Sequence, residues 1–164
     1  MKAGIITDSH DHHANVLKAI QIFNERRVKY VFHAGDIVAP FTAKKFAEVQ
    51  GAKFIAVFGN NDGERVNLRA TIAGFGGEIS DYAFEGTVEG KKIFMTHSQH
   101  YIEDAAKSQE HDLVIYGHTH KEDIRRVGRT LIMNPGESTD WLTGRAQVVI
   151  LELDSLEYEI VEIK

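Results

Sequence analysis

The 164-residue sequence contains no cysteine. This absence excludes disulfide bonds, thiolate nucleophiles and zinc-thiolate sites, so any metal ion must be held by nitrogen and oxygen ligands. The apolar runs are far shorter than a membrane-spanning helix needs, so no such helix is expected. A basic excess is also missing: the formal net charge is −5. This charge argues against nucleic-acid binding through a broadly basic surface.

The length and composition fit one globular domain over residues 1–164. No internal repeat, low-complexity tract or Pro/Gly/Ser-rich linker marks a place where a second domain could begin. The N-terminal stretch MKAGIITDSH meets a carboxylate after a few apolar residues and lacks a small-residue cleavage site. It is therefore predicted to form a core strand rather than a signal peptide, and a cytoplasmic protein is expected.

The first half of the chain alternates between strand and helix patterns. Residues 2–7 and 29–35 are short apolar runs typical of buried strands, and apolar side chains recur at helical spacing over 15–23 between them. Residues 40–49 begin with a proline suited to a first helical turn, and 53–59 indicate a third strand. This order predicts parallel strands joined by helices.

The second half of the chain has more strand patterns. Two strands are expected to join near Glu89, followed by a short helix over 101–109 and a strand over 112–117. Two further strand pairs are predicted to turn at Gly128 and near Ser155. These strands are too many for one doubly wound sheet, so two packed sheets with helices outside are expected.

Polar side chains that can bind a metal ion follow five of the predicted strands. Ligands of open α/β sheets bind beyond the carboxyl ends of the strands. The five groups are Asp8-Ser9-His10, Gly35-Asp36, Gly59-Asn60-Asn61-Asp62, Thr96-His97 and Gly117-His118-Thr119-His120. Three of them begin with glycine, where a sharp turn or a close backbone approach is expected. Each group alone fits an ordinary turn, but their recurrence at successive strand ends favours a metal site.

The spacing within two of these groups suggests paired ligands. Asp8 and His10 are two residues apart, and so are His118 and His120. Side chains at this spacing point to the same side of an extended segment. Each pair is therefore expected to present its side chains together.

Taken together, the motifs resemble those of the calcineurin-like metallophosphoesterase superfamily, whose pattern is D-x-H, GD, GNH(D/E), H and GH-x-H. The resemblance covers nearly the whole chain. The small size and the segments GDIVAP, GNNDG, YGHTH and NPGE look most similar to its compact bacterial and archaeal phosphodiesterase branch. The resemblance implies an α/β fold, a four-layer α/β/β/α sandwich of two packed mixed β-sheets flanked by helices, with a binuclear metal centre.

The resemblance also implies a ligand set that shares one carboxylate between two metals. The first metal would be held by Asp8, His10, Asp36 and His120. The second would share Asp36 and add Asn60, His97 and His118. Independently of any family, such oxygen and nitrogen ligands suit divalent ions, with Mn²⁺ expected first and Ni²⁺, Fe²⁺, Zn²⁺ or Mg²⁺ also compatible.

A centre of this kind implies a metal-dependent hydrolase. A metal-bridging hydroxide would attack the phosphorus of a phosphate ester, and no covalent phosphoenzyme is required. The expected enzyme is a phosphohydrolase, with phosphodiesterase favoured over phosphomonoesterase. Its partner would be a small phosphate-ester substrate, with no membrane and no nucleic acid expected, and a homo-oligomer is compatible with this assignment.

One position departs from the family pattern. Asn61 stands where the family usually has a histidine that protonates the leaving group, and an amide cannot do so. We assign catalytic roles to Asp36 as the shared ligand and to Asn61 as a donor that orients the substrate phosphate. Asn60 and His97 are expected to contact the substrate as well as the metal.

Further residues near the motifs have two interpretations. His12, His13 and His100 are alternative acids, although each fits a surface histidine better. Asp62 could orient a neighbouring ligand or only form a turn. In NPGE, Asn134 and Gly136 are expected to shape a loop beside the site, and the role of the glutamate is left open.

The remaining histidines and two aromatic residues are expected to be structural. His33 lies within an apolar run and is predicted to be a hydrogen-bonded core residue, whereas His111 is predicted at the surface. Trp141 and Phe41 are assigned to core packing by default, although either could stack on an aromatic leaving group.

Two other function classes compete with the phosphodiesterase. The first is a non-catalytic protein-binding scaffold, because the implied fold also resembles the retromer subunit, a relative that has lost ligands. The second is a nuclease, because larger relatives combine this centre with DNA-gripping additions. The complete ligand set argues against the scaffold, and the negative charge with no visible extra domain argues against the nuclease.

Overall fold

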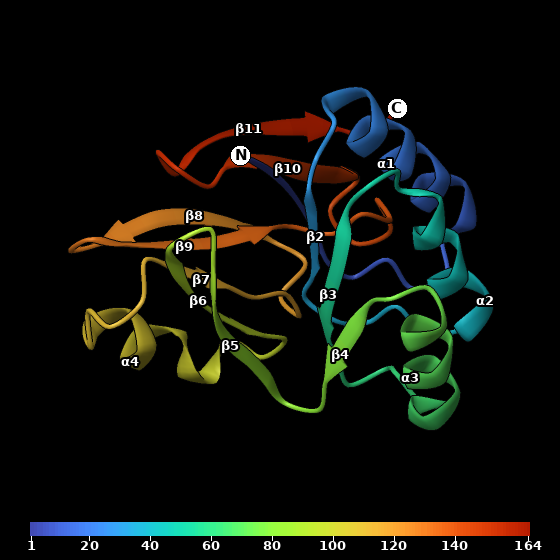
Figure 1. Cartoon of the computed structure of the whole chain (residues 1–164), viewed down its shortest axis with the longest axis horizontal. Helices are drawn as coiled ribbons and strands as arrows, with labels where there is room; N and C mark the ends of the chain where they lie inside the picture. The colour runs from blue at the N-terminus through green and yellow to red at the C-terminus, as the bar shows by residue number, and fades with distance from the viewer.

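Six of the eleven strands form one mixed sheet in the computed structural model, which describes all residues 1–164 (Figure 1). In the order across the sheet they are β11 (Glu157–Glu162), β10 (Gln147–Glu152), β1 (Lys2–Ile6), β2 (Tyr30–His33), β3 (Lys53–Val57) and β4 (Glu78–Ser80). Strands β1 to β4 are parallel, and β10 and β11 extend the sheet in antiparallel fashion. The predicted parallel arrangement of the first strands is confirmed.

The other five strands form a second mixed sheet. Its order is β5 (Ala83–Val88), β6 (Lys91–Thr96), β7 (Leu113–Ile115), β9 (Thr130–Pro135) and β8 (Glu122–Val127). The central strands β6, β7 and β9 are parallel, and the hairpin partners β5 and β8 lie antiparallel at the two edges. The hairpin turns predicted near Glu89 and Gly128 lie where expected.

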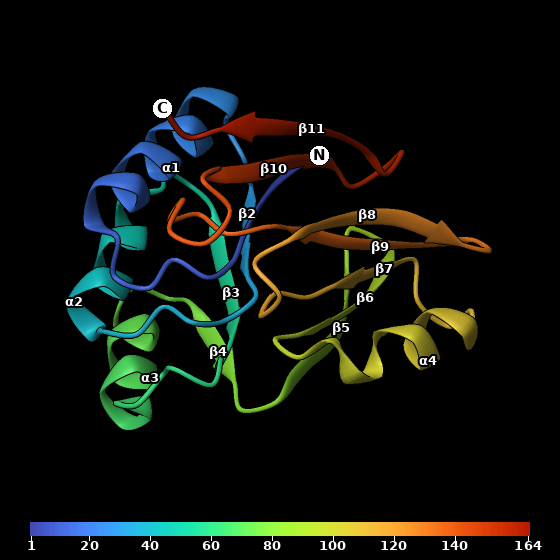
Figure 2. The same ribbon diagram turned by 180° about the vertical axis from the view of Figure 1, so that it is seen from behind.

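Helices cover the outer faces of both sheets. They are α1 (His13–Arg26), α2 (Pro40–Ala43), α3 (Arg65–Gly74) and α4 (Ile102–Lys107), with 3₁₀ turns at Lys44–Glu48 and Gln99–Tyr101. Figure 2 shows α1, α2 and α3 on the side of the six-stranded sheet and α4 on the opposite side of the molecule. None of these helices combines the length and the apolar character needed to cross a membrane.

Three apolar cores lie between the layers. The largest packs α1 and its neighbours on the six-stranded sheet through residues such as Val16, Phe23 and Leu68. A second lies between the sheets and joins residues of both, including Phe32 and Met95. A third, smaller cluster packs α4 on the five-stranded sheet. The expected α/β/β/α sandwich is therefore confirmed.

Two details differ from the sequence-based expectation. The helix predicted over 40–49 is a single α-helical turn that continues as a 3₁₀ turn. The segment 65–80 was not assigned, yet it forms α3 and β4. Helix α3 buries only Leu68 and Ile72, and β4 has three residues, so neither produces a strong periodic pattern.

Candidate metal centre

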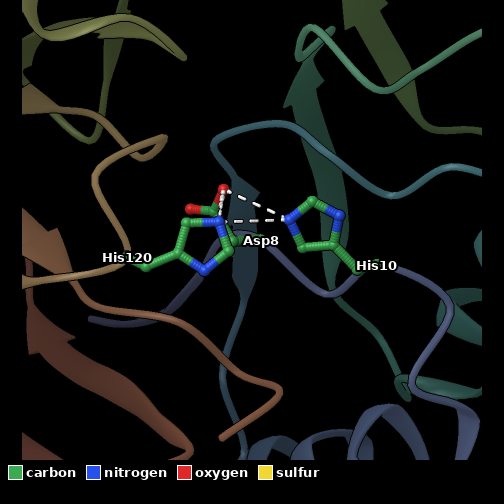
Figure 3. Close-up of side chains that lie close together, drawn as sticks. All are labelled: Asp8, His10 and His120. Carbon is green, nitrogen blue, oxygen red and sulfur yellow. Dashed lines mark hydrogen bonds and ion pairs between the residues drawn. The ribbon is translucent and has the colours of Figure 1, made fainter. Parts of the chain in front are cut away.

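The first group of candidate ligands consists of Asp8, His10 and His120 (Figure 3). Asp8 and His10 follow β1, and His120 follows β7 in the other sheet. The Nε2 atoms of His10 and His120 lie 3.3 Å apart, and they lie 3.7 and 3.5 Å from Asp8 Oδ1. The loops after two strands of different sheets thus direct three ligand atoms toward one another.

The second group surrounds Asp36, which follows β2. His97 Nε2 lies 3.3 Å from Asp36 Oδ2 and 3.0 Å from Asn60 Oδ1. His118 Nδ1 lies 2.8 Å from the same amide oxygen of Asn60. Asp36 also joins the two groups, because its Oδ2 is 3.6 Å from His10 Nε2. The structure therefore brings all seven predicted ligands into one cluster.

The donor set of the cluster fits bound cations. Asp8 Oδ1 is buried and has no hydrogen-bond donor, which is costly for a carboxylate oxygen. The Nδ1–H of His97 donates to Ala34 O at 2.7 Å, so the neutral form of His97, which is the form that binds a metal, has the lone pair of Nε2 directed toward the oxygens of Asp36 and Asn60. A cation between these groups removes both conflicts, and the oxygen and nitrogen donors suit divalent ions.

The charges of the cluster shift the pKa values of its members toward ionised forms. Burial opposes ionisation of Asp36, but hydrogen bonding to His97, the charge of His97 and donation by Asn61 lower the pKa of its carboxyl. The neighbouring carboxylates of Asp8 and Asp36 raise the pKa of His10 despite burial. Burial lowers the pKa of His97, but its contact with Asp36, the charges of Asp8 and Asp36 and its bond to Ala34 together outweigh burial and raise the pKa. Such shifts concentrate at functional sites.

The backbone of the ligand loops is left-handed rather than extended. The φ angles are +51° at Asp8, +39° at His10, +58° at Asp36, +68° at His118 and +60° at His120. The extended backbone assumed for the i, i+2 pairs is therefore wrong. Asp8 and His10 nevertheless lie together as predicted, with Asp8 Oδ1 3.7 Å from His10 Nε2, whereas His118 and His120 join different groups. His118 reaches Asn60, and His120 reaches His10. Residues in this region cost about 1–3 kcal/mol each and persist only where their surroundings fix them.

Glycines allow the ligand loops to approach one another, as predicted. A Cβ at Gly59 would lie 2.0 Å from Asp36 Oδ1. A Cβ at Gly117 would lie 2.0 Å from Thr7 Oγ1 and 2.8 Å from Asp8 Oδ2. Neither distance is compatible with any side chain, so both positions require glycine.

Glu137 holds the ring of His120, a role that the sequence left open. The fully buried carboxylate accepts from His120 Nδ1 at 3.0 Å and Thr139 Oγ1 at 2.6 Å, and from the backbone N–H groups of Leu142 and Thr143 at 2.9 and 2.6 Å. Burial opposes its ionisation, but these hydrogen bonds lower the pKa of Glu137 to about 2. Because Nδ1–H is committed to Glu137, the Nε2 lone pair of His120 faces the cluster.

Asp62 combines the two roles considered for it. Its Oδ2 accepts from the backbone N–H of Asp36 at 3.1 Å and of Gly59 at 2.6 Å, and its Oδ1 accepts from Val38 N at 2.7 Å. It therefore shapes its own turn and fixes the loop that carries Asp36. Asn134 acts similarly as a loop brace, donating to Gly117 O at 3.1 Å.

Asn61 lies against the shared carboxylate. Its backbone N–H and its side-chain amide each donate to Asp36, both at 2.8 Å. Of the alternative acids, His12 accepts from the backbone N–H of Asn15 at the start of α1, and His13 is exposed. His100 is exposed and lines a cleft beside the second group.

His33 is a hydrogen-bonded core residue, as predicted. It is fully buried, accepts from Gly35 N at 3.2 Å and lies 3.0 Å from Ser9 Oγ. Burial lowers the pKa of His33 to about 3. His111 is a correction, because it is buried and its Nε2 lies 2.9 Å from Glu85 Oε1, whereas a surface position was expected.

The default assignment of two aromatic residues to the core was wrong. Trp141 is 60% exposed and Phe41 is 64% exposed. The Trp141 ring lies 6.3 Å from the ring of His10 and 5.6 Å from that of His12, so it stands at the rim of the first group. Glu137 fixes the loop that carries Trp141. Hydrophobic periodicity in the sequence does not show that this carboxylate is buried, so the exposed position of Trp141 could not be predicted from it.

Comparison with known proteins agrees with this geometry. Residues 1–156 match the model of the calcineurin-like phosphoesterase superfamily domain. A protein of Methanocaldococcus jannaschii named as a phosphodiesterase is 43% identical over 165 residues, covering 98% of this chain and 99% of its own. The solved structure of an archaeal phosphodiesterase has a TM-score of 0.93 and 41% identity, with 99% of both chains covered. A single mutant of Vps29 from Entamoeba histolytica, at 18% identity and full coverage of both chains, has a TM-score of 0.71 and shares the fold. The chain belongs to the calcineurin-like phosphoesterase superfamily.

Proposed function

We propose that this chain is a metal-dependent phosphodiesterase that hydrolyses small phosphate esters. The observation that carries the proposal is the convergence of seven ligand side chains, with Asp36 among them, including a buried oxygen of Asp8 with no hydrogen-bond donor. The curated protein and the solved structure above 40% identity are both named as phosphodiesterases, which supports the same activity. The proposed ligands are Asp8, His10, Asp36, Asn60, His97, His118 and His120.

The protein residues have separate tasks in this proposal. Bound divalent cations, Mn²⁺ first, would lower the pKa of a water molecule and polarise the phosphoryl oxygens. Asp36 serves both groups, since its carboxylate contacts His10 as well as His97. Glu137 keeps the Nε2 lone pair of His120 directed into the cluster.

Asn60, Asn61 and His97 are proposed to contact the substrate phosphate. The Asn61 amide already donates to a carboxylate oxygen of Asp36, so its NH₂ group can also donate a hydrogen bond to a phosphoryl oxygen. It carries no proton that it can release to a leaving group. We therefore expect diesters with good leaving groups, such as aryl esters, to react fastest.

The experiment that tests the function compares two carboxylate variants. Chelator-treated protein supplied with Mn²⁺ or Ni²⁺ should hydrolyse bis(4-nitrophenyl) phosphate, and Asp36→Asn should abolish the activity. Asp104→Asn, on the exposed surface of α4, should leave it unchanged. Absence of metal-dependent turnover with any phosphate ester would contradict the proposal.

The competing functions make different predictions for the same protein. A scaffold on the fold shared with Vps29 would need no metal-dependent turnover. A nuclease would bind DNA, which the net charge of −5 opposes. Two earlier expectations stay predictions: that residues 1–164 form one domain, and that the protein is cytoplasmic.

A further inference from the structure

A cleft of about 380 Å³ opens beside the second group of candidate ligands. Asn60, His97 and His118 form part of its wall, and Tyr82 and Tyr101 form another part. This volume lies in the range of about 300–1,000 Å³ found for small-molecule sites. A phosphate held by the cluster could therefore extend one of its ester groups into this space.

The two tyrosines offer aromatic surfaces that the rest of the chain leaves mostly uncovered. Tyr82 is 84% exposed and lies between β4 and β5, whereas Tyr101 is 65% exposed and ends the 3₁₀ turn after β6. Neither ring stacks on another aromatic side chain, and neither hydroxyl is hydrogen-bonded within the protein. Two such rings lining one cleft suit a planar partner, because aromatic rings gain from stacking as well as from burial.

Arg65 adds a positive charge without a carboxylate partner to the same cleft. Its guanidinium lies 5.0 Å from the centre of the Phe58 ring and donates only to the backbone oxygens of Asp62 and Gly59. The neighbouring Arg69 lies over the same ring at 5.2 Å but is paired with Asp81. Arg65 is thus positioned to attract an anionic ligand, which a phosphodiester is.

We propose that this cleft binds an aromatic ester group, aryl or nucleoside, of the phosphodiester substrate. The ring would lie against Tyr82 and Tyr101, and Arg65 would complement the negative charge of the diester. This inference rests on the proposed function, since the cluster must hold the phosphate. It names a substrate class: diesters with at least one aromatic ester group, in preference to purely alkyl diesters.

A binding experiment tests the cleft directly. The protein loaded with Mn²⁺ is titrated calorimetrically with phenylphosphonate and with methylphosphonate, which differ only in the group beyond the phosphorus. Wild-type protein should bind the phenyl compound about tenfold more tightly, as expected for stacking on an aromatic side chain. The double variant Tyr82→Ala, Tyr101→Ala should lose this preference, and Tyr82→Phe, Tyr101→Phe should keep it.

Trp141→Ala is the matched control, because Trp141 is an exposed aromatic residue beside the other group of ligands. It should retain the phenyl preference. A wild-type protein without the preference, or a preference lost in Trp141→Ala and kept in the double alanine variant, would overturn the cleft assignment. Turnover of bis(4-nitrophenyl) phosphate is measured on the same proteins. Turnover tests the proposed function, whereas the preference for the phenyl compound tests the assignment of the cleft.

Discussion

The two groups of candidate ligands differ in what surrounds them. In the first, Asp8 is fully buried, and His120 is held from behind by the buried carboxylate of Glu137. In the second, Asn60 and His118 are exposed and line a cleft. The end near Glu137, hereafter the closed end, is therefore more enclosed by protein, and the end near Asn60 and His118, hereafter the open end, is more accessible to solvent. The difference suggests that the closed end fixes ligand geometry and the open end admits substrate.

The largest effect is expected from a substitution that displaces Asp36, the ligand that the two groups share. Gly59→Ala places a Cβ against the carboxylate of Asp36, so both groups should lose metal affinity and the protein should be destabilised by about 1–3 kcal/mol. Gly63→Ala, in the same loop, has no atom within 4 Å of the added Cβ and should leave both properties unchanged. Urea unfolding and metal stoichiometry measure the two effects. Normal binding of two metals by Gly59→Ala would refute the close approach.

A smaller effect is expected in the metal affinity of only one of the two groups. Glu137→Gln removes the charge that holds His120, so the affinity of the first group for metal should fall about 10- to 100-fold. The second group, which Glu137 does not contact, should keep its affinity. Glu122→Gln is the control, because Glu122 is exposed and its carboxylate accepts from Gln147 instead. Equal losses at both groups, measured by stepwise metal titration, would remove the proposed contrast between a closed and an open end.

The smallest effect concerns a residue behind the cluster rather than within it. His33 has a pKa lowered to about 3 by burial, whereas an unfolded histidine titrates near pH 6.5. Between these pH values the unfolded chain binds more protons than the folded protein. The contribution of His33 to the free energy of unfolding is therefore complete above pH 6.5 and falls as the pH decreases toward 3. The slope contributed by this residue is at most about 1.4 kcal/mol per pH unit.

The variant His33→Gln tests this assignment in metal-free protein. Its amide does not titrate in this range, so urea unfolding between pH 6.5 and 4 should show a shallower dependence than wild type. A slope identical to that of wild-type protein would mean that His33 takes up its proton equally well in the folded state.

The sequence pattern was sufficient for most of the fold and for the location of the cluster, and the family resemblance supplied its seven members. Short apolar runs predict buried strands, and polar residues directly after them predict a site at the strand ends, because parallel strands end at the same edge. Asp8, Asp36 and His97 all follow strands in this way. The glycine before Asn60 also signalled a close approach, and its contact with Asp36 confirms it.

What the sequence could not supply was the detail that depends on contacts distant in the chain. The buried carboxylate of Glu137 is satisfied by five donors from its own loop and from His120, and no local pattern encodes such convergence. The left-handed backbone of Asp8 and His10 was missed because nonglycine residues rarely adopt it without tertiary support. Trp141 was misplaced because its apolar character alone predicts burial, whereas the loop holds it at the surface.

The left-handed backbone at five of the candidate ligands has a consequence for how metal affinity depends on the rest of the protein. Folding, not cation binding, supplies the free energy that holds these loops in a demanding conformation, so the site is preorganised and binding involves little further loss of conformational entropy. Core substitutions far from the cluster should accordingly leave the intrinsic affinity of the folded chain unchanged. They would lower apparent affinity only by reducing the fraction of molecules that are folded.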